Sequence, residues 1–220
     1  MATINYNNIL LELLNELRSA DILSITERGL ATKTDSFTAA GGAQTFTLTE
    51  TSCKNVRWVK QAGVSLSYGT DYAFTYSASK NISAVVVSKS LTLGAKITIS
   101  YDYGTGDKIY PDFARPYISI SSFPRISFNY INGDTEVIAV DGVQAFSPLM
   151  QFTIYDYGVE ALHTKMTNLR QFIKNKQQGL YYSNILRIVG GRPYELIREE
   201  GKNKIYKMDL DVKNELNIER

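Results

Sequence analysis

Histidine and cysteine are almost absent from this sequence, whose 220 residues include one of each. A single cysteine cannot form an intrachain disulfide or supply a cysteine-rich zinc or iron–sulfur site. A single histidine, His163, excludes metal sites built on several histidines, and a Ser-His-Asp or Cys-His catalytic group would have to use this one residue. We therefore expect no enzymatic activity, no catalytic residues, no metal and no cofactor.

Long hydrophobic runs are absent as well. No stretch approaches the ~18 consecutive apolar residues that a membrane-spanning helix needs. The first nineteen residues contain two acids and no basic segment of the kind that starts a signal peptide. We expect a soluble protein, made in a reducing compartment, with no membrane partner.

The chain is rich in apolar and aromatic residues. Hydrophobic residues make up 44%, with fifteen tyrosines and nine phenylalanines, which is enough to build a core and excludes a disordered chain. The 24 basic and 22 acidic residues nearly cancel, leaving a net charge of +2. The length allows one or two domains.

Near the N-terminus, apolar residues recur at helical spacing from Tyr6 to Leu17, which predicts an amphipathic helix. Asn5, Asn7 or Asn8 would cap it. The helix is expected to end before Gly29, in a polar stretch rich in threonine, serine and glycine.

From about Gln44 to Tyr103 the pattern is that of short β-strands. Ile97, Ile99 and Tyr101 share one face of the last strand, and polar residues share the other. Such alternation, with glycine-rich turns between strands, predicts a small antiparallel sandwich or barrel. A linker with glycines and prolines follows it.

The third region begins with strands. We expect them at Arg125 to Ile131, Glu136 to Val140 and Met150 to Tyr155. Asn132-Gly133-Asp134, between the first two, predicts a hairpin turn.

A second helix is expected from Val159 to about Lys176, where apolar residues repeat at spacings of three and four, with Asp156 as its cap. Strands should follow at Ile185 to Val189, Pro193 to Ile197 and Lys204 to Val212.

The resulting order of elements predicts an α+β fold. A mixed or antiparallel sheet is flanked by two helices, and an antiparallel β-sandwich-like domain is inserted after the first helix. The predicted boundaries are 1–36 for the first helix and linker of the α+β core, 37–110 for the inserted domain and 111–220 for the rest of the core.

Several motif-like patterns have ordinary structural explanations. Asp209 and Asp211 share a strand face and resemble a metal-binding pair, but the lysines beside them fit an ordinary solvated strand. The glycine-rich segments 104–108 and 190–193 lack the phosphate-loop pattern and a following helix, so we interpret them as turns. His163 lies on the flank of the second helix, where we expect a surface or interface role.

Charge is distributed unevenly. Between residues 165 and 207 ten basic residues face three acids, a local net charge of +7. Such a segment neutralises nucleic-acid phosphates, meets an acidic face of a neighbouring subunit, or is simply solvated. The predicted patch, at a lumen or subunit interface, comprises Lys165, Arg170, Lys174, Lys176, Arg187, Arg192, Arg198, Lys202, Lys204 and Lys207.

Tyrosines gather in the predicted β domain. They suit sheet packing and interfaces, and exposed aromatic rows also bind sugars or single strands. The five are Tyr68, Tyr72, Tyr76, Tyr101 and Tyr103.

Two stretches resemble virion proteins of tailed phages. The run from Val56 to Tyr103, with Gly69-Thr70-Asp71-Tyr72 in its middle, resembles a β-sandwich module of those proteins. The order of N-terminal helix, Arg125 to Phe128, Phe152 to Tyr155, long helix and closing strand pair resembles tail-terminator and neck (head-to-tail joining) proteins. Compact terminators lack an insertion of this size, which leaves open a terminator, another neck ring or a tail-tip component.

The resemblance implies a structural virion protein that forms a homo-oligomeric ring, commonly a hexamer, capping the tail tube. Its implied partners are further copies of itself, the tail-tube protein, a head-completion or connector protein, and genomic DNA passing through the lumen without sequence specificity. It would be assembled in the host cytoplasm and lie at the tail–head junction of the virion. A carbohydrate-binding β-sandwich module and a DNA-binding protein are the alternatives.

Overall fold

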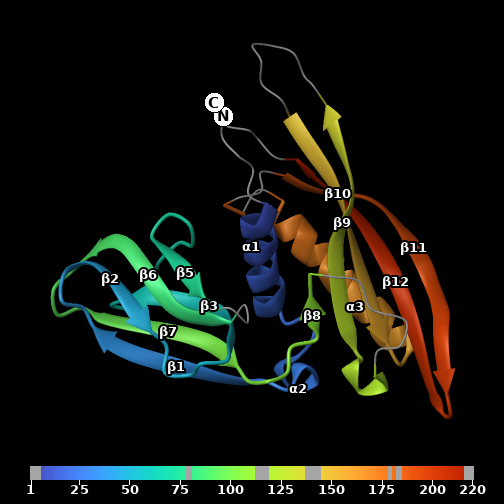
Figure 1. Ribbon diagram of the computed structural model, residues 1–220, viewed down its shortest axis with the longest axis horizontal. Helices are drawn as coiled ribbons and strands as arrows, with labels where there is room; N and C mark the ends of the chain where they lie inside the picture. Colours follow the sequence, from blue (N-terminus) through green and yellow to red (C-terminus); the bar gives the residue numbers. More distant parts are fainter. Residues whose placement is uncertain are drawn as a thin grey trace. The chain divides into compact units, whose positions relative to one another are not determined.

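The computed structural model describes residues 6–77, 81–111, 119–136, 145–177, 180–181 and 185–215. The protein has a mixed α+β fold in which strands predominate. It divides into two compact units (Figure 1). The inserted unit is Ser24–Asp107, and the core unit is formed by the chain on both sides of it, Met1–Leu23 and Lys108–Arg220.

The core unit contains a five-stranded sheet with the order β11-β12-β10-β9-β8. The four long strands are antiparallel, whereas the short β8 pairs with β9 in parallel. Its elements are α1 (Tyr6–Ser19), β8 (Ile109–Tyr110), the 3₁₀ turn η1 (Ile120–Ser122), β9 (Arg125–Glu136), β10 (Ala145–Asp156), α3 (Val159–Asn175), β11 (Ile185–Glu200) and β12 (Asn203–Glu215).

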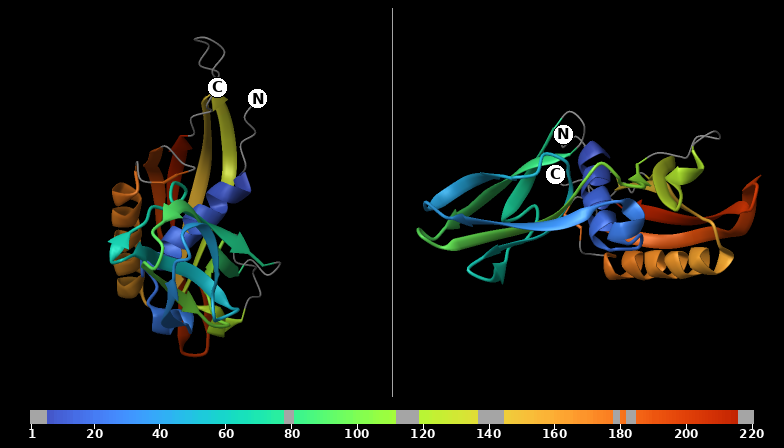
Figure 2. Two further views of the ribbon diagram at one scale, coloured as in Figure 1. Left: turned by 90° about the vertical axis from the view of Figure 1, so that its left-hand side faces the viewer. Right: turned by 90° about the horizontal axis from the view of Figure 1, so that it is seen from below.

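One face of this sheet is covered by the two helices, and Figure 2 shows α3 lying along the sheet. Leu17 of α1 and Leu169 of α3 are fully buried in one apolar cluster with alternate residues of the strands. In that cluster the rings of Phe128 and Phe152 stack, with centroids 5.6 Å apart. The apolar residues that repeat every second position in the strands therefore pack in one core with those that repeat at helical spacing in α1 and α3.

The other face of the sheet carries buried polar residues beside a small apolar cluster of Phe123, Tyr155 and Ile205. Thr153 and Asp209 lie opposite each other on β10 and β12, and both are buried. The Thr153 hydroxyl donates a hydrogen bond of 2.7 Å to Asp209. Ser127 of β9 is also buried on this face.

The predicted turn at Asn132-Gly133-Asp134 is wrong. These residues continue β9 and pair with Leu149, Pro148 and Ser147 of β10. Long-range pairing has overridden the local turn preference, as tertiary context often does. Most of the predicted strand from Glu136 to Val140 lies outside the described residues.

The two strands predicted at 185–189 and 193–197 form the single strand β11. Register shifts between Ile188 and Gly190 and between Arg192 and Glu195 accommodate the glycine pair and Pro193. A proline is tolerated here because β11 is an edge strand and need not donate on its outer side.

Helix α3 begins at Val159 as predicted, but Asp156 is not its cap. The N-cap is Gly158, which makes no side-chain capping bond. The Asp156 carboxylate instead accepts a hydrogen bond from the backbone N–H of Tyr157 at 2.7 Å and pairs with Lys165 Nζ at 2.6 Å.

The inserted unit has its own apolar core and a seven-stranded sheet with the path β1-β7-β3-β6-β2, in which β4 pairs with β3 and β5 with β6. Its elements are α2 (Ile25–Arg28), β1 (Ala31–Thr38), β2 (Gly42–Thr47), β3 (Cys53–Gln61), β4 (Val64–Ser65), β5 (Tyr72–Tyr76), β6 (Ile82–Leu91) and β7 (Lys96–Tyr103).

This unit begins earlier than the predicted boundary at residue 37. Strand β1 was expected to be part of a polar linker, yet it pairs with β7 from Ala31↔Tyr103 to Thr38↔Lys96. Before it, α2 is held by a reciprocal capping box of Ser24 and Glu27. Gly29 ends α2 with a φ of 69°, in the left-handed region that glycine tolerates.

A buried charge network joins the beginning of the inserted unit to its end. Arg28 is fully buried and donates hydrogen bonds to the side chain of Asn55 at 3.1 Å and to the backbone carbonyl of Asp107 at 3.3 Å. Its guanidinium also lies 3.8 Å from the Asp102 carboxylate, which accepts a 2.7 Å hydrogen bond from Arg57. Arg28 thus fastens the first turn of the unit to its last residue.

Candidate functional site

The ten residues of the predicted basic patch do not form one surface. Arg170 and Lys174 are exposed on α3, over the apolar face of the sheet. Arg187 and Arg192 are exposed on β11 and pair in register with Lys213 and Asp209, whose side chains belong to the opposite face. Lys202 is exposed in the turn after β11, and Arg198 is half-buried.

Acids neutralise other members of the predicted patch. Lys165 is buried against Asp156, and Lys204 lies 3.7 Å from Glu199. The remaining two pairs, each 2.7 Å long, are Lys176 with Glu16 of α1 and Lys207 with Glu195. Because Glu16 and Asp156 lie outside the basic segment, counting charges within that segment overstated its net charge.

Lys207 lies near two carboxylates. Its ammonium donates to Glu195 and lies 3.8 Å from Asp209. The hydrogen bond to Glu195 raises the pKa of Lys207 above its ordinary value, more than partial burial lowers it. It therefore belongs to a structural ion pair across β11 and β12.

The remaining motif residues occupy structural positions. His163 is exposed and packs edge-on against Tyr194 of β11, with ring centroids 5.6 Å apart. Asp211 accepts a 3.2 Å hydrogen bond from Gln151. Like Asp209, it therefore accepts a hydrogen bond from a side chain of the neighbouring strand β10. Within the described ranges no three His, Cys, Asp or Glu side chains are grouped to hold a metal ion.

The five tyrosines of the β domain are not an exposed row. Tyr72 and Tyr101 are buried, and Tyr68, Tyr76 and Tyr103 pack half-buried against the same core. The Tyr101 hydroxyl donates a 2.9 Å hydrogen bond to Asp35, and burial raises the pKa of this phenol.

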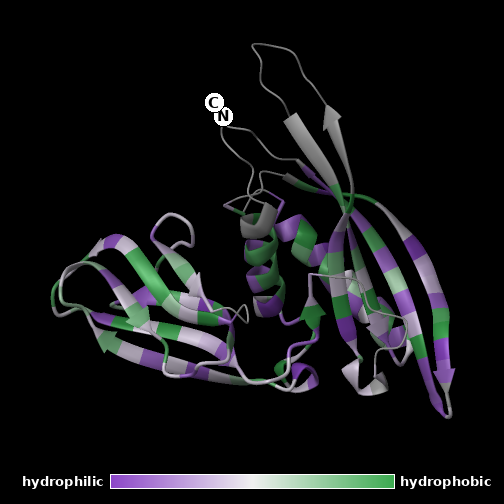
Figure 3. Ribbon diagram, viewed as in Figure 1, coloured by the Kyte–Doolittle hydropathy of each residue, from purple (hydrophilic) through white to green (hydrophobic). Residues whose placement is uncertain are grey.

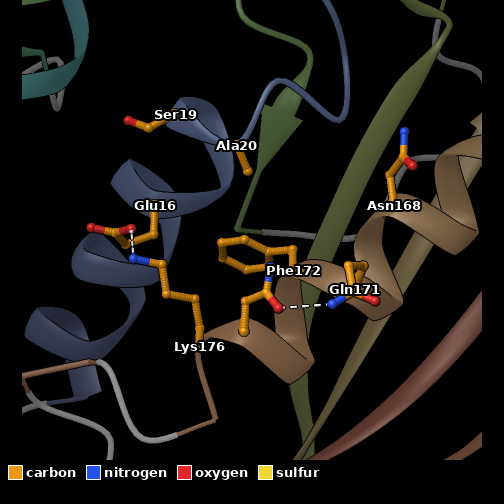
Figure 4. A pocket seen from close by; sticks show the side chains of 8 residues that line it. Glu16, Ser19, Ala20, Asn168, Gln171, Phe172 and Lys176 are labelled. Carbon is orange, nitrogen blue, oxygen red and sulfur yellow. Dashed lines mark hydrogen bonds and ion pairs between the residues drawn. The ribbon is translucent and has the colours of Figure 1, made fainter.

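An open hollow of about 400 Å³ lies between α1 and α3 (Figure 4). The Glu16–Lys176 ion pair lies at one side, and Phe172 faces the hollow from α3. Gln171 donates a 2.8 Å hydrogen bond to Asn175 beside it. The lining is mainly polar, made of amides, the Ser19 hydroxyl and one ion pair, which suits polar contact.

The feature that sequence reasoning missed is the exposed apolar surface of β11. Nine large apolar side chains are exposed among the described residues, and four of them lie on this strand. In Figure 3 hydrophobic and hydrophilic bands follow one another along β11. We call the four side chains the β11 stripe: Val189 at 52% exposed, Tyr194 at 47%, Leu196 at 48% and Ile197 at 41%. The sequence predicted two strands here, at 185–189 and 193–197, but no local signal told that they lie at an edge of the sheet.

The β11 stripe is the arrangement with the clearest capacity for function. A strand at a sheet edge presents unpaired backbone groups, and exposed apolar side chains there favour contact with another polypeptide. None of the helices in the described ranges has the length and apolar content needed to cross a membrane. No family model matches the chain, and no curated protein matches its sequence.

Proposed function

We propose that this protein is a structural virion protein of a tailed phage, a ring-forming tail terminator or neck protein that caps the tail tube and joins it to the head connector. The proposal rests on the resemblance noted in the sequence and on one structural observation, the β11 stripe. In this proposal the core unit, a sheet flanked by two helices, builds the ring. In this proposal the inserted, sandwich-like unit either lies on the outer surface of the ring or contacts a neighbouring subunit.

The β11 stripe supports self-association because it is costly to leave in water. Fully burying a side chain such as valine, leucine or isoleucine contributes about 1.5–3 kcal/mol, so a contact covering half-exposed residues gains part of that at each position. Bulges and Pro193 are devices that discourage unwanted edge pairing. Because the bulges and Pro193 limit non-specific pairing, the four exposed apolar residues beside them favour contact with one specific partner rather than aggregation.

Head-to-tail contacts join two different surfaces of the same subunit, so they build an open filament of unlimited length unless the assembly closes on itself. A ring is the assembly in which all such contacts are closed. One face of such a ring would meet the tail tube and the other the connector. The exposed Arg187 and Arg192 would be the candidates for sequence-independent contact with DNA phosphates in the lumen.

The test uses the full chain and tail tubes purified from the same phage. Mass photometry should show one oligomer of fixed stoichiometry, and electron microscopy of the mixture should show it seated at tube ends. A protein that stays monomeric and never associates with tubes or connectors would refute the proposal.

Another tail or tail-tip component is the alternative within the same class, since it would need the same oligomeric surface. Immunogold labelling of intact virions separates the two. Label at the tail–head junction supports a terminator or neck protein, whereas label at the distal tip supports the alternative.

A further inference from the structure

We infer that copies of this chain join edge to edge, so that one sheet continues from subunit to subunit. The part of β11 before Pro193 in one copy pairs antiparallel with the outer edge of β9 beyond Ser127 in the next. This inference builds on the proposed ring. It goes beyond that proposal by naming the two strands that form each interface.

The first observation is that, among the described residues, the core sheet has an open edge on each side. Strand β11 ends the sheet on one side. On the other side, β8 pairs with β9 only at Ile126 and Ser127. In the described chain no strand lies along the rest of β9 on that side, where β9 continues to Glu136. Each copy therefore offers two different edges, as a head-to-tail contact requires.

The second observation is strand direction. β9 and β12 run one way, and β10 and β11 run the other, because each neighbouring pair is antiparallel. A second copy placed beside β11 in the same orientation brings its β9 alongside, antiparallel to β11. The helices of both copies then remain on the same side of the continued sheet.

The third observation is a matched pair of apolar bulge residues. On β11 the register passes from Ile188 to Gly190 and skips Val189, which is 52% exposed. On β9 it passes from Tyr130 to Asn132 and skips Ile131, which is 45% exposed. Bulges change the direction of side chains at sheet edges. Here each of the two edges has a bulge, and the bulge carries an exposed aliphatic residue.

A second copy of the chain is thus the occupant that the structure favours. Pairing β11 with β9 covers both open edges and both exposed aliphatic residues in every subunit of a closed ring. Pairing β11 with another β11 would make a closed dimer and leave both β9 edges uncovered. A partner of a different sequence would account for one edge only.

The test is cysteine cross-linking, for which this chain has a low background. Its single cysteine, Cys53, is fully buried in the inserted unit. Val189→Cys and Ile131→Cys are prepared separately and together, and treated with a short bis-maleimide. The double variant should give a ladder of covalent oligomers. A mixture of the two single variants, one carrying a mass tag, should give only mixed dimers.

The controls define what overturns the inference. Dimers from Val189→Cys alone would indicate β11–β11 pairing instead. The double variant Lys174→Cys, Val189→Cys should give no ladder, because Lys174 is exposed on α3, over a face of the core sheet and not at its β9 edge. An assembled ring without the Val189–Ile131 cross-link also overturns the inference.

The outcomes for the two proposals are distinguishable. A ring that binds tail tubes without this cross-link leaves the proposed function standing. A cross-linked ladder that never binds tubes leaves the interface standing and removes the function. If the variants fail to assemble, hydrogen exchange on the unaltered protein decides. Amides of both β9 and β11 should become protected in the oligomer, and protection of only one of these strands, or of neither, overturns the inference.

Discussion

Gly106 lies against the backbone of Arg28 so closely that a Cβ at position 106 would stand 2.0 Å from the Arg28 carbonyl oxygen. The chain leaves the inserted unit directly after this contact. Because backbone atoms on both sides form the contact, a substitution cannot be absorbed by rotating a side chain.

We predict that Gly106→Ala destabilises the inserted unit by about 1–3 kcal/mol or more, the usual cost of overpacking. Urea unfolding followed by fluorescence reports on this unit, because the only tryptophan, Trp58, lies in β3. Gly158→Ala is the control, since nothing lies within 4 Å of its added Cβ. Equal midpoints for the two variants would contradict the prediction.

The Arg28 network gives a second prediction. Arg28→Met should lower the stability of the inserted unit by about 3 kcal/mol, because it removes one partner of a buried carboxylate. Asp102 retains hydrogen bonds from Arg57 and Thr32, which places the cost at the low end of the usual range. Arg28→Lys should rescue little, since one ammonium cannot reproduce the forked contacts to Asn55 and Asp107. Full rescue by lysine would show that charge alone matters.

The β11 stripe predicts a selective effect on assembly. Leu196→Lys should raise the protein concentration at half-assembly by roughly tenfold or more, the equivalent of about 1.4 kcal/mol at each interface. Thermal stability should change little because Leu196 is nearly half exposed. Leu93→Lys is the matched control at an even more exposed leucine of the inserted unit. Mass photometry over a dilution series measures both, and identical curves would argue against the stripe as an interface.

Alkaline pH should weaken the inserted unit. Burial raises the pKa of Tyr101 above its ordinary value of 10.0, so the unfolded chain ionises first as pH rises. The stabilising contribution is therefore complete below pH 10.0 and is lost as pH climbs through the raised pKa. Tyr101→Phe should flatten the dependence of the unfolding free energy between neutral pH and about pH 11. Urea titrations followed at Trp58 give that slope, and an unchanged slope would rule out Tyr101 as its source.

Sequence periodicity predicted those elements whose signal is local. Helix α3 and strands β7 and β12 carry uninterrupted patterns, and the structure confirms all three. Strand β1 was missed because only Asp35 of its eight residues is buried, so its sequence shows no apolar alternation. It is held by pairing with β7, more than fifty residues away along the chain.

The candidate interaction surface on β11 was less accessible to prediction for a related reason. A two-residue period tells which side chains share a face, but it carries no information on strand order. That β11 is an edge strand, and that Val189 and Ile131 are skipped by the register, depends on partners elsewhere in the chain. Likewise, Lys176 finds its acid on α1.

The contact between Arg28 and Asp107 has a consequence for how such a protein can evolve. Because Arg28 and Asp107 meet, the segment between Ser24 and Asp107 begins and ends at nearly the same point in space. Segments with adjoining ends can be gained or lost from a loop without pulling the host fold apart. A lineage could therefore acquire or discard this unit in one genetic event, and vary what it touches, while the sheet of the core unit remains unchanged.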